Sequence, residues 1–168
     1  MEKLKKLLMV LSGVALLTGA TAAGQSKPES LQGVWQTVEV TLTGPGARTI
    51  TIPEPRPNLM IASAKHYSRV EVQTEQPRPG LADAAKASAD ELRAVWGPFV
   101  GEAGTYEVTG TNVLTMRPIA AKNPAAMAQG AFITYSFKRE GDTIWVTQVR
   151  NQNGPFVNPV TIKAVRVE

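Results

Sequence analysis

Few residues of this chain are of a type that could carry chemistry. Among its 168 residues there is one histidine and no cysteine, which excludes a cysteine nucleophile and the His/Cys sets that hold zinc. The histidine, His66, stands two residues before Ser68. Residues at this spacing on a strand are about 7 Å apart, too far for a base to accept a proton from its nucleophile. We therefore expect no serine–histidine catalysis, no metal and no cofactor.

Charged residues within alternating segments are stronger candidates for a binding site. Alternation places Glu39 on the same strand face as Trp35, and it places Arg69 and Glu71 on the same face as Tyr67. Charged side chains are usually exposed, which favours the outer face for them. In the alternative arrangement these charges lie inside and must be paired, since an unpaired buried ion costs several kcal/mol. Such a cluster would suit a ligand with a polar head.

The segments that would position these residues have the two-residue periodicity of β-strands. Eight or nine short strands joined mostly by hairpins are typical of an antiparallel barrel or sandwich. The strands are expected at 34–42, 50–52, 59–63, 66–73, 104–109, 112–119, 131–139, 143–150 and 160–167.

One stretch, 81–96, has a helical composition, and Ser88 with Glu91 could form a capping box for a shorter helix within it. Trp96 and Phe99 flank the Gly97-Pro98 break that ends this stretch. We expect these two aromatic residues to dock the helix onto the sheet, or to cover the open end of a barrel.

The first residues have the pattern of a secretory signal peptide. Three lysines precede a short apolar run, 7–17, and small residues follow at 20–22. The run is shorter than the roughly 20 residues that span a bilayer. We expect cleavage after Ala22, with Ala23 as the alternative site and an uncleaved anchor as the alternative reading. Residues 23–30 would form a flexible polar segment before a single domain at 31–168.

The charge of the chain gives no indication of a nucleic-acid partner. Residues 1–22 hold three lysines and one glutamate, so their removal lowers the formal net charge from +4 to +2. The remaining basic residues are scattered, whereas nucleic-acid binding requires a clustered basic face. We expect a small-molecule partner, no membrane span after cleavage, and a monomer or weak homodimer.

Six segments in order resemble the bacterial lipocalin-like domain proteins, over about 31–168. They are Leu31-Gln32-Gly33-Val34-Trp35, Pro57–Ile61 leading into Lys65–Ser68, Trp96–Phe99, Gly104–Val108, Ala121–Pro124 and Arg166–Glu168. The resemblance implies an antiparallel barrel of about eight strands around a cavity. It further implies that Gly33, Trp35 and Arg166 close one end, with Trp35 packed under Arg166. The chain lacks the disulfide and the Thr-Asp-Tyr segment of classical lipocalins.

These observations predict an all-β, lipocalin-like barrel of eight or nine strands with one short inserted helix. It would be periplasmic or secreted and would bind a small, partly apolar molecule. The expected ligand-binding residues are Glu39, Tyr67, Arg69, Trp96, Phe99, Tyr106, Met116 and Trp145.

Two alternatives stay open. In the first, the barrel is an isomerase- or cyclase-type enzyme in which Glu39, Glu71 or His66 transfers a proton and Tyr67 or Tyr106 stabilises charge. In the second, it is a structural module with an interior filled by side chains.

Overall fold

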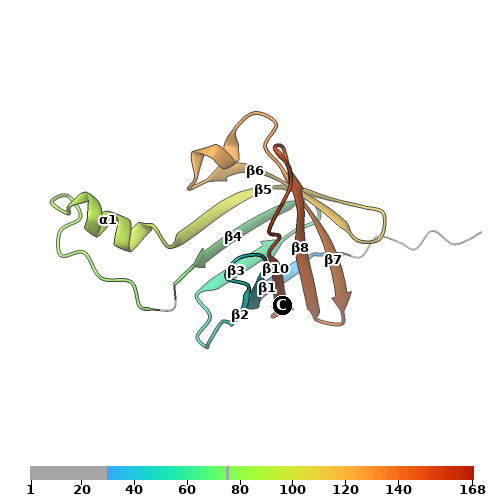
Figure 1. Ribbon diagram of the computed structural model, residues 1–168, viewed down its shortest axis with the longest axis horizontal. Helices are drawn as coiled ribbons and strands as arrows, with labels where there is room; N and C mark the ends of the chain where they lie inside the picture. Colours follow the sequence, from blue (N-terminus) through green and yellow to red (C-terminus); the bar gives the residue numbers. More distant parts are fainter. Residues whose placement is uncertain (1–29, 75) are drawn as a thin grey trace, which may run out of the picture.

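The computed structural model describes residues 30–74 and 76–168. The expected leader and almost all of the polar segment 23–30 lie outside these residues. The described chain is mostly β-sheet (Figure 1). Its elements are β1 (Gly33–Leu42), β2 (Arg48–Thr51), β3 (Asn58–Ala62), β4 (His66–Val72), α1 (Ala89–Trp96), β5 (Phe99–Thr109), β6 (Val113–Ala121), the 3-10 helix η1 (Pro124–Met127), β7 (Ile133–Glu140), β8 (Thr143–Asn151), β9 (Gly154–Pro155) and β10 (Thr161–Arg166).

Eight of the strands close into an antiparallel barrel in the order β10-β1-β3-β4-β5-β6-β7-β8, and β10 pairs again with β8. The short strands β2 and β9 add to β1 and β8. Closure removes the unpaired edges that an open sheet would expose. The predicted all-β barrel with one short helix is confirmed.

One end of the barrel is closed where the start of β1 meets the C-terminus. The amide of Val34 donates to the Glu168 carbonyl at 2.9 Å, and the amide of Val167 donates to the Val34 carbonyl at 2.8 Å. Gly33 has a φ of 136°, and a Cβ there would lie 2.6 Å from the Glu168 carbonyl oxygen. The glycine of the Gly-x-Trp motif is therefore required by both backbone conformation and space.

The core lies inside the barrel. Buried side chains from β1, β4, β6, β7, β8 and β10 form one cluster, joined by Leu31 from the segment before β1. Its members are Leu31, Trp35, Tyr67, Leu114, Met116, Tyr135, Phe137, Ile144 and Ala164.

The helix is shorter than the predicted helical stretch 81–96. Ser88 caps α1: its hydroxyl accepts from the Glu91 amide at 3.3 Å, and the Glu91 carboxylate accepts from the Ser88 amide at 2.7 Å. These hydrogen bonds lower the pKa of Glu91. The cap confirms the shorter helix, while 81–87 forms no α-helix. No residue of α1 is buried, and Figure 1 shows the helix beyond the ends of β4 and β5.

A lysine holds the end of this helix to the sheet. The ammonium of Lys122 donates to the Trp96 carbonyl, to the Gly97 carbonyl at 3.1 Å and to the Phe99 carbonyl at 2.9 Å. Cations at helix C-termini are stabilising because they satisfy carbonyls that have no partner within the helix. Polar contacts from Lys122, the residue that follows β6, therefore hold the end of α1.

Candidate functional site

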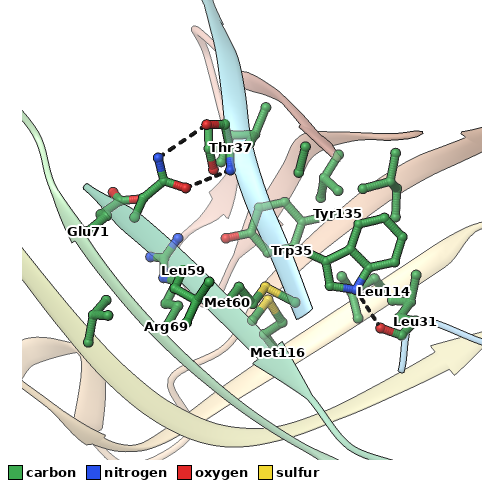
Figure 2. A pocket seen from close by; sticks show the side chains of 16 residues that line it. Leu31, Trp35, Thr37, Leu59, Met60, Arg69, Glu71, Leu114, Met116 and Tyr135 are labelled. Carbon is green, nitrogen blue, oxygen red and sulfur yellow. Dashed lines mark hydrogen bonds between the residues drawn. The ribbon is translucent and has the colours of Figure 1, made fainter. Parts of the chain in front are cut away.

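The barrel encloses a cavity of about 80 Å³ whose wall is mostly aliphatic (Figure 2). Polar groups enter the wall from β1, β3 and β4 on one side and from β7 on the other. The lining residues are Leu31, Trp35, Thr37, Asn58, Leu59, Met60, Arg69, Val70, Glu71, Leu114, Met116, Tyr135, Ile144, Val146, Ile162 and Ala164.

Among the residues that the structure describes, Arg69 is the one basic residue of the cavity wall. In the barrel it pairs with Met60 on β3 and with Glu102 on β5, so all three side chains point inward. Its Nε lies 3.1 Å from Oε1 of Glu102, and the side chains are 23% and 12% exposed. The Nε–H is buried but is not aimed at that oxygen, and it makes no hydrogen bond within the described chain. The Nε–H group of Arg69 is therefore available to donate a hydrogen bond to a ligand.

The groups around Arg69 form one electrostatic cluster. The Tyr67 hydroxyl donates to Oε1 of Glu102 at 3.1 Å. Burial alone would lower the pKa of Arg69, but the charge of Glu102, with smaller effects from Tyr135, Glu71 and Tyr67, raises it overall. Burial, reinforced by the charge of Glu102, raises the pKa of Tyr67. The pKa of Tyr135 is also raised, mainly by burial. Arg69 thus stays charged, and both tyrosines stay protonated.

Asn58 has a structural part in the cavity wall. Its Oδ1 accepts from the Thr37 amide at 2.6 Å, and its Nδ2 donates to the Thr37 carbonyl at 3.1 Å. These bonds continue the β1–β3 contact beyond Trp35 and Met60, where the backbone pairing ends. Because both ends of the amide are engaged, Asn58 is a poor anchor for a ligand.

Four of the eight predicted ligand-binding residues lie inside the barrel. Arg69 and Met116 line the cavity. Tyr67 is buried in the core with its hydroxyl on Glu102. Tyr106 packs against the core, and its hydroxyl donates to the Ser63 carbonyl at 2.5 Å. The preference for an outer position of the Arg69 face was wrong, because the β4 register turns this face inward.

Glu39 lies on the outer face, contrary to the prediction from simple alternation. A β-bulge between Thr37 and Glu39 shifts the register of β1 against β10. Thr37 pairs with Ala164 of the cavity wall, whereas Glu39 pairs with Lys163. The bulge reverses which residues of β1 point inward beyond Thr37, so Glu39 does not reach the interior. The acidic partner of Arg69 inside the barrel is Glu102 instead.

Trp145 also lies outside the cavity. Its neighbours Ile144 and Val146 line the wall, so alternation turns Trp145 outward. There it pairs with Lys138 and Lys163, whose ammonium groups lie 5.8 and 5.6 Å from the ring centroid. The ring is thus covered by lysine side chains instead of contacting a ligand in the barrel.

The remaining aromatic pair does not cover the barrel. Trp96 is 52% exposed and meets Phe99 edge to face, with ring centroids 6.1 Å apart. Arg78 lies over Phe99 at 5.8 Å. Neither ring lines the cavity. Their edge-to-face contact joins the last residue of α1 to the first residue of β5.

The closed end differs from the expected arrangement in one contact. Trp35 and Arg166 are paired across β1 and β10, but the guanidinium over the Trp35 ring, 5.4 Å from its centroid, is that of Arg139. Arg166 instead extends across Gly33, and its Nε donates to the Glu168 carbonyl at 2.7 Å. Trp35 also donates its indole N–H to the Leu31 carbonyl at 2.9 Å.

Sequence reasoning missed two polar residues of the site. Glu102 falls in the first part of β5, ahead of the predicted strand start at 104. Tyr135 falls within the predicted strand 131–139, whose alternation alone does not mark it as a site residue. Alternation within β7 and β8 groups Tyr135 with Phe137, and Ile144 with Val146, but it does not say which group faces inward.

No protein-family model matches the chain, and no curated protein matches its sequence. Over residues 30–74 and 76–168, no three or more acidic or histidine side chains are grouped as a metal ion would need. The same residues include no helix with the length and apolar character needed to cross a membrane.

Proposed function

We propose that this chain is an exported, lipocalin-like binding protein whose barrel holds a small, mostly apolar molecule beside Arg69. The observation that carries the proposal is a guanidinium with an unused N–H in the wall of an otherwise apolar cavity. Small-molecule sites have this composition, because apolar walls supply affinity and a few polar groups fix orientation. The signal-peptide pattern at 1–22 supports export, and the Gly-x-Trp opening supports the lipocalin-like assignment.

The cavity volume limits the size of the ligand. An engineered cavity of about 150 Å³ holds benzene, and the volume here is about 80 Å³. Two wall residues, Met60 and Met116, have flexible side chains that can adapt to an occupant. The cavity therefore fits a molecule of a few non-hydrogen atoms, or one that displaces a methionine side chain.

The same small volume favours a second candidate, a structural module with a nearly filled interior. The enzyme alternative has less support: of its three proposed proton-transfer residues, only Glu71 lines the cavity. Glu39 faces outward, and His66 is exposed at the β3–β4 turn.

Native mass spectrometry on protein purified from its own host distinguishes these functions. We expect an added mass that denaturation releases. Ala164→Leu fills the cavity from its wall, and the added mass should disappear. Val165→Leu is the matched control, since Val165 is next on β10 and faces away from the cavity. A bare chain mass for all three proteins would favour the structural module.

A further inference from the structure

We propose that the ligand is uncharged and carries a carbonyl group, as in a small ketone or ester, which accepts hydrogen bonds from Arg69 and Tyr135. This inference rests on the proposed binding function and specifies the chemical class of the ligand.

The donors come from opposite sides of the cavity. Arg69 is on β4 and Tyr135 on β7, and Figure 2 shows the Tyr135 hydroxyl turned toward the guanidinium. The buried Nε–H of Arg69 has no hydrogen bond within the described residues, and the terminal nitrogens carry four further N–H groups. Buried polar groups without partners are costly, so an acceptor placed between these donors would be favoured.

The charges near the donors decide which acceptor fits. Arg69 already lies beside the Glu102 carboxylate. The Glu71 carboxylate is a second negative group close enough to interact with the charge of Arg69. Glu71 lines the cavity directly. A ligand carboxylate would add a third acidic group around one guanidinium, and like charges at close range repel.

The other charged class is disfavoured for a different reason. An ammonium ligand has only N–H donors, so it would leave Arg69 and Tyr135 without an acceptor. A carbonyl oxygen accepts from both donors and leaves the charge of the site unchanged. The aliphatic side of the cavity, which includes Leu114, Ile144 and Ile162, would then hold the hydrocarbon part.

Four probes of similar size test this class: butan-2-one, propanoate, butylamine and pentane. Their binding is followed by the methyl NMR signals of Met60 and Met116, which line the cavity. We expect butan-2-one to bind about tenfold tighter than propanoate or butylamine. If propanoate or butylamine binds as tightly as butan-2-one, or if pentane alone binds, the inference is wrong and the cavity is still a binding site. If no probe binds, the proposed function fails as well.

Two variants of the wall separate the charge argument from a general loss of structure. Glu71→Gln should strengthen propanoate binding about tenfold relative to butan-2-one binding, because one repelling carboxylate is removed. Glu107→Gln is the control, since Glu107 is exposed and pairs with Arg117 away from the cavity. Equal propanoate affinities in Glu71→Gln and wild type would contradict the charge argument.

The second variant removes the donor. The double substitution Arg69→Met with Glu102→Gln deletes both members of the ion pair, so it leaves no buried charge unpaired. The glutamine oxygen can still accept from Tyr67. We expect a folded barrel in which butan-2-one binds about tenfold more weakly and pentane binds as before. Unchanged butan-2-one affinity in this variant would overturn the role of Arg69.

Discussion

Replacing Arg139 with methionine should destabilise the barrel more than the same replacement at Arg166. Arg139 lies over the Trp35 ring at 5.4 Å and donates to the carbonyls of Gly141 at 2.8 Å and Ser30 at 2.6 Å. Within residues 30–74 and 76–168, Arg166 makes one side-chain hydrogen bond, to the Glu168 carbonyl. The contacts of Arg139 thus join three parts of the closed end.

The magnitudes follow from these contacts. A cation–π contact of this kind contributes about 1 kcal/mol, and each net hydrogen bond about 1 kcal/mol. Arg139→Met should therefore lower the free energy of unfolding by about 3 kcal/mol, and Arg166→Met by about 1 kcal/mol. For a domain of this size, the difference of about 2 kcal/mol corresponds to about 6 °C in Tm.

A double-mutant cycle with Trp35→Phe isolates the contact itself. Urea unfolding is followed by circular dichroism, because Trp35→Phe alters the fluorescence. We expect a coupling energy of about 1 kcal/mol between positions 35 and 139, and one below about 0.3 kcal/mol between 35 and 166. If the larger coupling is with Arg166, the described closed end is wrong and the arrangement implied by the lipocalin resemblance is correct.

Three further results are expected. Burial raises the pKa of all three tyrosines in the folded protein. The contribution of the protonated tyrosines to the free energy of unfolding is therefore fully present below pH about 10. It is lost as the pH rises through the pKa values of the folded state. Tyrosinate absorbance should therefore appear only with unfolding, and a normal titration near pH 10 in the folded protein would contradict this. Asn58→Ala should cost about 2 kcal/mol in urea unfolding, because two hydrogen bonds to the Thr37 backbone are lost. Gly104→Ala should cost about 3 kcal/mol, since its Cβ would lie 2.1 Å from the Arg117 carbonyl oxygen, whereas Gly80→Ala, with open space around it, should be nearly neutral.

The strands could be predicted because their signals are local. The hairpin β7–β8 has clear alternation on both sides of Glu140-Gly141-Asp142, and the predicted ranges agree with the structure to within two residues. The Ser88 cap is equally local. Each of these features depends on residues adjacent in sequence.

The interior of the barrel could not be predicted in the same way. The inward direction of Arg69 depends on its pairing with Met60 and Glu102 from two other strands. The outward direction of Glu39 depends on one extra residue in β1, which forms a bulge with no glycine to mark it. Both are properties of strand register, and a shift of one residue exchanges the two faces.

The contact between Arg139 and the Trp35 ring could not be predicted from the sequence either. Arg166 is paired with Trp35 across the sheet, so the resemblance to lipocalins pointed to the correct strand neighbour. Arg139 reaches the ring from β7, which is not adjacent to β1 in the sheet. Contacts across the end of a barrel leave no periodic signal in the sequence.

The most direct test of the central claim is a titration of the methionine methyl signals with butan-2-one. Met60 and Met116 line the cavity, and Met127 is 42% exposed on η1 and serves as an internal reference. The account predicts saturable shifts at Met60 and Met116, no shift at Met127, and loss of the response in Ala164→Leu. Shifts of equal size at all three methionines, or none at Met60 and Met116, would contradict a ligand-binding cavity in this barrel.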